Sequence, residues 1–229
     1  MIDIHSHILP LVDDGSVDME NSLAMLKECY DIGITDVILT PHYRGKFCKT
    51  PQELTTAFRS FKRRVKKEGI AINVHLGQEI YFTSDFMNEL SEGKILTLNG
   101  TKYILIECPY DDDCDVTDLV YELNYRDYVP IIAHVERFPY ISFEEIKEIK
   151  KLGGLIQINA SSLFSKDRRV DKKKIKKLFK NDLVDFVSSD AHYSRVNEMR
   201  RAYAYVEKKY GQKIAQKVFN DNAKKIIGG

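Results

Sequence analysis

The chain has 229 residues, of which 35 are basic and 34 are acidic, so its formal net charge is only +1. This balance provides no global field that would attract nucleic acid or an anionic membrane, so any affinity for a polyanion has to be local. The sequence has neither a lysine-rich leader nor a run of roughly 18 apolar residues, which predicts a cytoplasmic protein without membrane insertion.

Short apolar runs rich in β-forming residues alternate with longer segments of helical periodicity along the whole chain. Seven strands are predicted, at residues 2–5, 37–40, 72–76, 103–107, 130–134, 155–159 and 186–188. Capping boxes at Thr50 and Ser142 mark where two of the intervening helices begin. Gly33, Gly69 and Gly153 stand where helices should stop.

Several of these strands are apolar on both faces, as in YILIE at 103–107 and PIIAH at 130–134. Such strands are typical of a parallel sheet covered by helices, and seven units predict an α/β sheet that closes into a barrel. No internal repeat or Pro/Gly-rich linker interrupts the pattern, so a single domain over residues 1–229 is expected. The residues from Ser194 onward are expected to form one or two helices over an end of the barrel.

The four cysteines lack a C-x-x-C spacing and are too few for a disulfide framework. A cysteine-dependent phosphatase would carry C-x5-R, but the residues six positions beyond the cysteines are Thr35, Leu54, Cys114 and Val120. The sequence therefore excludes that chemistry, and we interpret the thiols as buried or idle.

Imidazoles and carboxylates follow the predicted strands, at the end where (β/α) barrels hold their reactive groups. These residues are His5, His7, His42, Glu79, Glu107, His134, Asp190 and His192. Five of the six histidines in the chain fall at these positions. A single histidine or glutamate at a strand end is more often a hydrogen-bonding group than a ligand, but a gathering of this size at one rim favours a metal site.

The spacing of two residue pairs supports this interpretation. Residues i and i+2 of a strand point to the same face, so His5 and His7 can aim at one point, and so can Asp190 and His192. The first and last strands become neighbours when a barrel closes, so the two pairs should face each other. Asp14, in the loop after the first strand, can fold back and add an oxygen ligand.

Imidazole and carboxylate ligands without cysteine suit divalent ions such as Mn²⁺, Fe²⁺ or Zn²⁺. With Asp14 included, nine candidate ligands exceed what one ion binds. The sequence therefore predicts two or three ions, with a carboxylate such as Glu79 bridging them.

These motifs resemble the PHP (polymerase and histidinol phosphatase) superfamily, and most closely its bacterial manganese-dependent tyrosine-protein phosphatases of capsule and exopolysaccharide operons, the CpsB/YwqE type. The motifs IDIHSHILPLVDDG, TPHYR, GQEI, IIAHVER and SDAH occur in the family's order over the whole chain. The resemblance implies a distorted (β/α)7 TIM-like barrel of the PHP fold with a site for three ions. It assigns His5, His7, Glu79 and Asp190 to one ion, Glu79, Glu107 and His134 to a second, and Asp14, His42 and His192 to a third.

The resemblance also implies roles for two arginines. Arg137 matches the arginine of the family's H-P-E-R motif, and Arg195 matches the arginine that follows its S-D-A-H motif. Both are expected to bind phosphate oxygens, for which the planar, permanently charged guanidinium is suited. Val135 replaces the proline of H-P-E-R, a change that removes no ligand but affects the loop presenting Arg137.

The expected mechanism is direct attack on phosphorus by a metal-bound hydroxide, because the sequence offers no cysteine nucleophile. A tyrosine leaving group has a pKa of about 10, well below that of an alkyl alcohol, which favours aryl phosphates. His42 or Asp14 can hand over a proton to this group, and the sequence does not separate that role from metal ligation.

The leading functional hypothesis is a phosphatase for a cytoplasmic phosphotyrosine protein, which by resemblance is the tyrosine-rich tail of a bacterial kinase controlling polysaccharide assembly. A small-molecule phosphatase of the histidinol-phosphate kind is the nearest alternative. A PHP nuclease is disfavoured by the balanced charge and by the lack of an aromatic and basic strand-binding groove. A non-catalytic metal-stabilised scaffold is disfavoured by the full ligand set. The sequence leaves a homo-oligomer open.

Two charged runs need separate interpretation. In the run KDRRVDKKKIKKLFK at 166–180, apolar residues recur at helical spacing, which predicts a solvated basic face on an outer helix with at most a minor role toward an acidic phosphopeptide. The run DDDCD at 111–115 lacks the glycine and terminal glutamate of a calcium loop. It is predicted to be an exposed loop on the rim that carries the ligands.

Overall fold

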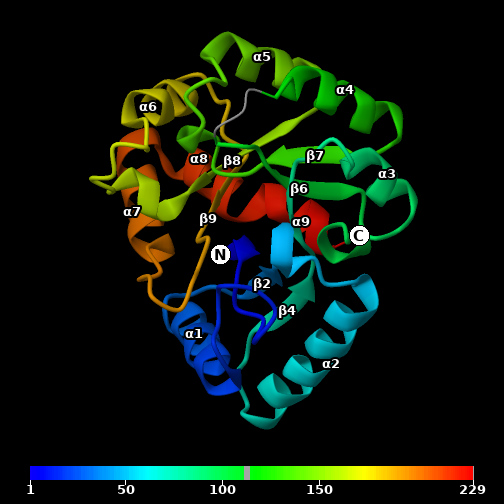
Figure 1. Ribbon diagram of the computed structural model, residues 1–229. Helices are drawn as coiled ribbons and strands as arrows, with labels where there is room; N and C mark the ends of the chain where they lie inside the picture. The colour runs from blue at the N-terminus through cyan, green and yellow to red at the C-terminus, as the bar shows by residue number, and fades with distance from the viewer. Residues whose placement is uncertain (111–113, 229) are drawn as a thin grey trace.

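The computed structural model describes residues 1–110 and 114–228, and in them parallel strands occupy seven successive positions surrounded by helices (Figure 1). The strands are β1 (Ile2–Ser6), β2 (Asp36–Leu39) with β3 (His42–Tyr43), β4 (Asn73–Leu76) with β5 (Glu79–Tyr81), β6 (Tyr103–Glu107), β7 (Val129–Ile132), β8 (Leu155–Asn159) and β9 (Phe186–Ser188). Their order is β1-β2-β4 in one sheet and β3-β5-β6-β7-β8-β9 in the other. The seven predicted strands are therefore confirmed.

The second and third positions are each interrupted once, which the sequence did not predict. The backbone remains paired through the break, because the Gly77 N–H donates to the Leu39 carbonyl at 2.9 Å and the Glu79 N–H donates to the Pro41 carbonyl at 3.1 Å. The break lets each position change direction between the lower barrel and the rim. His42 and Glu79, which are partners in register, lie just beyond it.

The barrel closes between β9 and β1 through a single bridge at the rim. The Asp190 N–H donates to the His5 carbonyl at 2.9 Å, and the His7 N–H donates to the Ala191 carbonyl at the same distance. The closed ring of seven positions confirms the distorted (β/α)7 barrel.

The helices cover the outside of the strands (Figure 1). They are α1 (Met19–Asp31), α2 (Pro51–Lys67), α3 (Phe86–Ser91), α4 (Val116–Tyr125), α5 (Phe143–Lys151), α6 (Lys172–Lys180), α7 (Met199–Tyr210), α8 (Gln212–Gln216) and α9 (Asn222–Ile227), with a π-helical turn at Lys217–Asp221. Both predicted capping boxes are present, with Thr50 capping α2 and Ser142 capping α5. Gly33, Gly69 and Gly153 follow helix ends at positive φ, as predicted.

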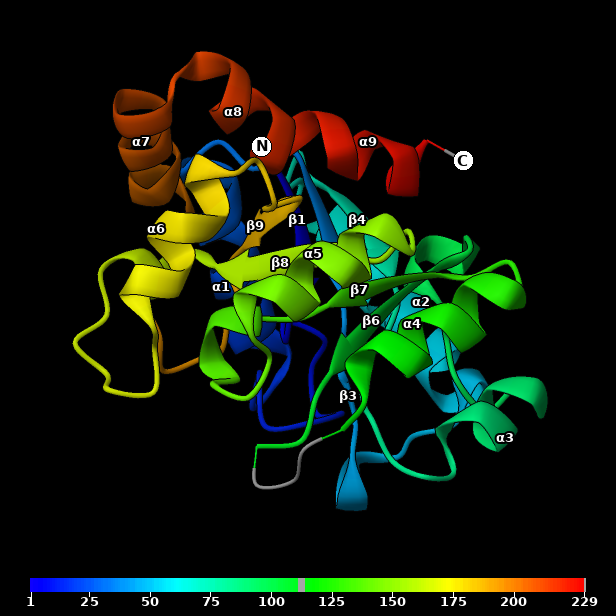
Figure 2. The ribbon, with the colours of Figure 1, turned by 90° about the horizontal axis from the view of Figure 1, so that it is seen from above.

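The C-terminal segment covers the end of the barrel opposite to the loops that follow the strands (Figure 2). Ala223 and Ile226 are buried among apolar side chains of the lower barrel, including Ile4. The Asn222 amide donates to the Asp185 carbonyl at 2.9 Å, just before β9. The predicted placement over the barrel end is thus confirmed, but residues 194–228 form three helices, α7, α8 and α9, and not one or two. The opposite end is left for polar groups.

The structure also bears on the acidic run at 111–115 and on the expectation of no membrane insertion. In the predicted run at 111–115, residues 111–113 lie outside the described residues, whereas Asp115 is exposed and caps α4 by accepting a hydrogen bond from the Asp118 N–H. Among residues 1–110 and 114–228, no helix combines the length and apolar character needed to cross a membrane.

Candidate metal centre

The histidine pair of β1 points into the barrel, where both rings are fully buried. The Nδ1 atom of His7 lies 2.7 Å from Asp13 Oδ2, and the Nδ1 atom of His5 lies 3.3 Å from Gln157 Oε1. Because each Nδ1 faces an acceptor, we assign the proton to Nδ1, and each Nε2 keeps its lone pair. Acceptors that fix the tautomer in this way are typical of metal-binding histidines.

The two Nε2 atoms lie only 3.2 Å apart. Two lone pairs at this separation repel each other unless a cation attracts both. Two nitrogens about 2.1 Å from one ion and at right angles to it are about 3 Å apart. The geometry of His5 and His7 therefore fits a shared divalent ion.

Glu79 lies at the centre of the imidazoles, and its side chain is buried. Its Oε1 lies 3.2 Å from His5 Nε2 and 3.0 Å from His134 Nε2. Its Oε2 lies 3.3 Å from His7 Nε2 and 2.8 Å from His42 Nδ1. The Oε2 and His42 Nδ1 atoms are buried without a hydrogen bond of suitable direction in spite of their proximity. A carboxylate oxygen and an imidazole nitrogen that lie this close without a hydrogen bond between them fit two metal-ligand atoms, with the carboxylate bridging two ions.

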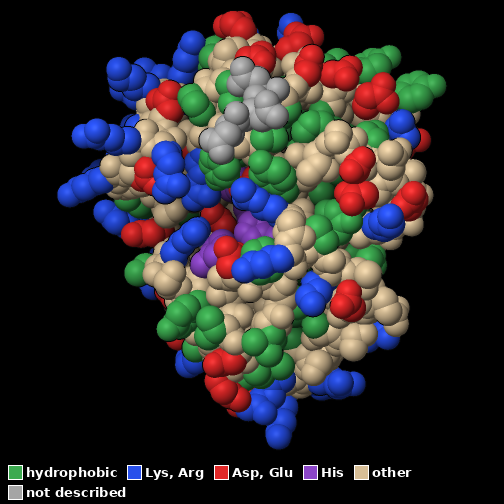
Figure 3. All heavy atoms as spheres, viewed as in Figure 1, with side chains coloured by type: hydrophobic (Ala, Val, Ile, Leu, Met, Phe, Trp, Pro, Cys, Tyr) green, Lys and Arg blue, Asp and Glu red, His purple; other side chains and the backbone are tan. Residues whose placement is uncertain are grey.

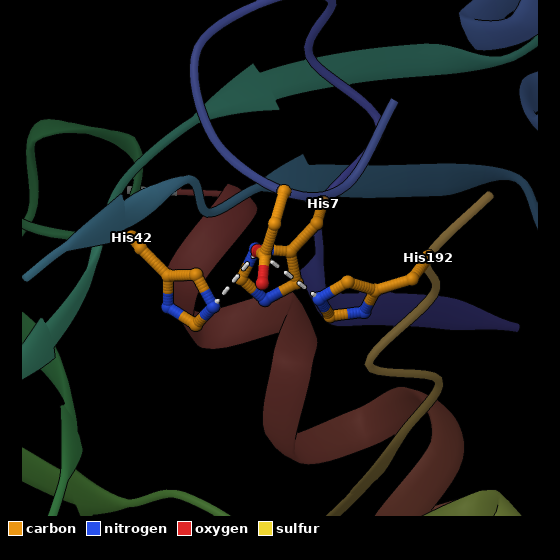
Figure 4. Close-up of side chains that lie close together, drawn as sticks. His7, His42 and His192 are labelled. Atoms are coloured by element: carbon orange, nitrogen blue, oxygen red, sulfur yellow. Dashed lines mark ion pairs between the residues drawn. The ribbon is translucent and has the colours of Figure 1, made fainter. Parts of the chain in front are cut away.

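A second group gathers nearer the mouth of the site. Asp14 Oδ1 lies 3.4 Å from His42 Nε2 and 3.6 Å from His192 Nε2 (dashed lines in Figure 4). The rings of His42 and His192 flank that of His7 (Figure 4), with centroids 4.3 Å from it in both cases. Burial lowers the pKa of His192 to about 4. His192 is therefore neutral, as a ligand must be, at any pH well above 4.

Asp190 connects the histidines to both predicted arginines. Its Oδ1 lies 3.6 Å from His5 Nε2, whereas its Oδ2 lies 3.2 Å from Arg137 Nη2 and 3.3 Å from Arg195 Nη1. Burial alone would raise the pKa of Asp190, but the neighbouring imidazoles and the Arg137 guanidinium hold it well below the usual range. Asp190 is therefore ionised and can bind an ion on one side while it orients the arginines on the other.

Glu107 and His134 complete the set on the far side of Glu79. Glu107 Oε1 lies 3.7 Å from His134 Nε2, and Glu107 Oε2 lies 3.4 Å from Arg44 Nη1. Burial and the negative charge of Glu79 raise the pKa of Glu107. Glu79 and Glu107 are both buried and lie close together, and two such carboxylates are favourable only when cations compensate their charge.

The structure brings all nine predicted ligands together. The donor atoms form four overlapping groups: His7, Asp14, His42 and His192; His5, His7 and Asp190; His5, Glu79 and His134; and His42, Glu79 and Glu107. His5, His7, His42 and Glu79 each belong to two groups. The donor set fits several ions that share ligands.

Three residues that hold these ligands in place were missed by sequence reasoning. Asp13 orients His7, and Gln157 contacts His5 while it accepts the His134 N–H at 2.8 Å. Asn159 donates to Asp190 Oδ2 at 2.7 Å. Gln157 and Asn159 alternate within β8 just as His5 and His7 do around the end of β1. This alternation of amides in the otherwise apolar LIQIN is the sequence signal for Gln157 and Asn159, and the adjacency of Asp13 to Asp14 is the signal for Asp13.

The site opens into a cavity of about 370 Å³. Figure 3 shows histidines at the bottom of a hollow with Lys and Arg side chains around it. Arg44, Arg137, Arg169 and Arg195 line the cavity together with Tyr110. The acidic side chains inside the cavity are candidate metal ligands, whose charge bound ions would neutralise, and arginines surround them. This arrangement suits a small dianion such as a phosphate monoester.

The turn that carries Arg137 is held in place by a buried lysine. Its first residue, His134, has a left-handed backbone with φ of 31°, a conformation that persists only where the surroundings enforce it. Lys174 of α6 is buried, and its Nζ donates to the Val135 carbonyl at 3.1 Å and to the Phe138 carbonyl at 2.8 Å. These bonds secure the turn even though Val135 stands in place of a proline.

Replacing Lys174 by methionine should lower kcat/KM for an aryl phosphate roughly tenfold, because a displaced Arg137 meets the phosphate less well. Metal content should stay unchanged, since Lys174 contacts no ligand side chain. Steady-state kinetics with metal analysis of the purified variant measures both. Lys176→Met on the exposed side of the same helix is the control. Identical kinetics of the Lys174 variant and the control would contradict this positioning role.

The loop that carries Asp13 and Asp14 approaches β1 so closely that only glycine fits at position 15. A Cβ atom there would lie 2.0 Å from the His7 carbonyl oxygen and 2.4 Å from His7 Cβ. Gly15→Ala is therefore expected to cost about 2–3 kcal/mol of stability, equivalent to a melting temperature lower by roughly 5–10 °C. Gly33→Ala, which adds its Cβ to open space at positive φ, should cost only about 1 kcal/mol. Equal melting temperatures of the two variants would refute the steric account.

A closed parallel barrel with imidazoles and carboxylates at one rim is typical of metal-dependent hydrolases. Within this class, the chain belongs to the family of capsular polysaccharide synthesis proteins CpsB/CapC, whose family model matches residues 1–228. The resemblance seen in the sequence motifs is thereby confirmed.

The chain is 34% identical over 238 residues to the tyrosine-protein phosphatase CpsB of Streptococcus pneumoniae, an alignment that covers 99% of this chain and 98% of that protein. It is also 34% identical to the tyrosine-protein phosphatase YwqE of Bacillus subtilis, over 99% of this chain and 91% of that protein. A crystal structure from a study of YwqE and CpsB as metal-dependent tyrosine phosphatases superimposes with a TM-score of 0.85 and 34% identity, over 94% of this chain and 90% of that chain.

More distant structures share the fold alone. The histidinol phosphate phosphatase of Lactococcus lactis, solved with zinc, histidinol and phosphate, is 14% identical with a TM-score of 0.58, over 92% of this chain and 95% of that chain.

Proposed function

We propose that this protein is a metal-dependent phosphatase that hydrolyses phosphotyrosine in a protein substrate. The observation that carries this proposal is the convergence of nine imidazole and carboxylate ligands and two arginines on one cavity. The relatives named tyrosine-protein phosphatases, which align over nearly the whole chain, support the choice of substrate.

The nine ligands would hold two or three divalent ions, and we propose Mn²⁺ as the native metal, with Fe²⁺ or Zn²⁺ as chemically acceptable substitutes. When bound, such ions supply Lewis acidity and an activated water for attack on phosphorus. The tautomers of His5 and His7 and the ionised state of Asp190 prepare the protein side of the site for these ions.

The arginines act on the substrate. Arg137 and Arg195 both reach Asp190 Oδ2 and line the cavity, so their remaining N–H groups can bind the non-bridging oxygens of a phosphate monoester. Such contacts strengthen as charge develops on these oxygens in the transition state. Their shared contacts with Asp190 Oδ2 orient the two guanidinium groups in advance.

The leaving group departs toward the mouth of the cavity in this proposal. Asp14 is the most exposed of the candidate ligands, with 58% of its side chain accessible, and it contacts both His42 and His192. Asp14 or His42 can therefore pass a proton to a departing phenolate. Because a phenol has a pKa of about 10, this help is needed less than for an alkyl phosphate.

The family description and the relatives support a role in capsule synthesis. We propose that the substrate is the tyrosine-phosphorylated tail of a bacterial kinase controlling polysaccharide assembly, and that the encounter takes place in the cytoplasm.

The substrate choice is tested by comparing kcat/KM for a phosphotyrosine peptide, the matching phosphoserine peptide and histidinol phosphate, each with added Mn²⁺ and again with a chelator. We expect the phosphotyrosine peptide to be preferred and the chelator to abolish its hydrolysis. Preference for histidinol phosphate would instead assign the protein to the small-molecule phosphatases. Hydrolysis that persists in chelator would refute metal dependence.

A further inference from the structure

A groove runs from the catalytic cavity across the loop that precedes α6. It encloses about 940 Å³ and shares part of its wall with the cavity, including Tyr110, Arg137 and Val170. A peptide whose phosphotyrosine occupies the cavity can therefore continue into the groove without a break. An extended chain advances about 3.3 Å per residue, so the groove receives the residues next to the phosphotyrosine.

The outer wall of the groove is strongly basic. Four exposed side chains, Lys166, Arg168, Lys172 and Lys173, line it and are defined here as the basic wall. Among residues 1–110 and 114–228, none of the four has an ion-pair partner. Lys and Arg side chains gather on this side of the hollow (Figure 3).

The acidic side chains of the groove are already engaged. Asp167 forms an ion pair with Arg169 at 2.6 Å. Asp171 accepts from the backbone N–H groups of Lys173 and Lys174 at the start of α6. Glu136 is buried and accepts from the Asn159 N–H. The groove is lined by six basic side chains (Arg137, Lys166, Arg168, Arg169, Lys172 and Lys173) and three acidic ones (Glu136, Asp167 and Asp171), so it keeps an excess of positive charge although the protein as a whole is nearly neutral.

We infer that the groove binds carboxylate side chains that flank the phosphotyrosine, so that the protein selects substrates with acidic residues beside it. This inference rests on the proposed function. A peptide suits the groove better than a continuous polyanion does, because the groove also contains the apolar surfaces of Tyr110, Pro139 and Val170.

The test uses three phosphotyrosine peptides of equal length, flanked by glutamate, by glutamine or by lysine. We expect kcat/KM at low ionic strength to be about tenfold higher for the glutamate peptide than for the glutamine peptide, chiefly through KM. The preference should shrink as salt is added, because exposed charges are screened within a few ångströms at high ionic strength.

The double substitution Lys172→Glu/Lys173→Glu should remove this preference and favour the lysine peptide instead. Acidic residues are favourable in the first turn of a helix, so α6 is expected to fold in this variant. The matched control is Lys176→Glu/Lys180→Glu, which makes the same charge change on exposed positions of α6 outside the groove. Turnover of p-nitrophenyl phosphate should be the same in both variants and in the unmodified protein.

Equal kcat/KM for the three peptides in the unmodified protein would overturn the inference, and so would a preference for glutamate that survives in the Lys172/Lys173 variant. Tighter binding of a fluorescent oligonucleotide than of the glutamate peptide, lost in the same variant, would overturn it in favour of a polyanion site. These outcomes leave the proposed function intact. Absence of turnover of p-nitrophenyl phosphate and of all three peptides would overturn the proposed function, and the inference with it.

Discussion

Glu79→Gln is expected to reduce turnover of an aryl phosphate on the order of 10³-fold and to lower the metal content of the purified protein. Glu79 contacts four imidazoles, two through each carboxylate oxygen. Glutamine preserves the shape of the side chain but replaces one oxygen with an N–H donor, which cannot bind an ion and would point its hydrogens at ligand lone pairs. The centre of the site would therefore lose both charge and connectivity.

The measurement for this variant combines steady-state hydrolysis of p-nitrophenyl phosphate with elemental analysis of bound metal. Glu92→Gln is the control, because it makes the same chemical change at an exposed position, where Glu92 forms an ion pair with Lys94 far from the candidate ligands in the chain. A Glu79→Gln protein with full metal content and full turnover would show that Glu79 does not bridge ions.

Arg137→Ala is expected to lower kcat/KM about 10²-fold without loss of metal. Arg137 contacts Asp190 Oδ2, but Arg195 and Asn159 contact the same oxygen, so the carboxylate stays oriented when Arg137 is removed. The loss then falls on transition-state binding of phosphate oxygens. Lysine at this position should recover only part of the rate, since it offers a point charge in place of a planar fork.

Kinetics and metal analysis of Arg137→Ala and Arg137→Lys are compared with Arg126→Ala, which removes an exposed arginine at the end of α4. Full activity of Arg137→Ala would rule out a role in catalysis. Loss of metal from this variant would show instead that Arg137 acts by supporting the ligand Asp190.

The positions of the strands and helices were predictable because each carries a local signal. Apolar runs mark the strands, and Thr50 and Ser142 cap their helices by bonds to residues three positions along the chain. The breaks in the second and third strand positions carry no such signal. They depend on how Pro41 and Gly77 meet neighbouring strands, which only the closed barrel determines.

The candidate ligands were also predictable, because strand ends gather at one rim of a parallel barrel and the i, i+2 spacing of His5 and His7 sets their common direction. The groups in which their ligand atoms approach one another were not, since these depend on distances between strands that no spacing along the chain encodes. His42, for example, faces both Asp14 and Glu79.

The residues that support the ligands and arginines likewise depend on packing that the sequence does not show. Lys174 reads in the sequence as one more cation of a basic helix, yet its side chain is buried against the turn of Arg137. The other lysines of this run that line the groove are exposed. Only the packing of α6 against the barrel separates a positioning residue from a solvated one.

The central claim is that the rim of imidazoles and carboxylates holds more than one divalent ion and that catalysis depends on them. Its most direct test is a titration of the metal-free protein with Mn²⁺, in which bound ions per chain and turnover of p-nitrophenyl phosphate are measured on the same samples. The account predicts that activity appears only as two or more ions bind, and that Glu79→Gln fails to reach this stoichiometry. Full activity with no ion bound, or saturation at a single ion, would contradict it.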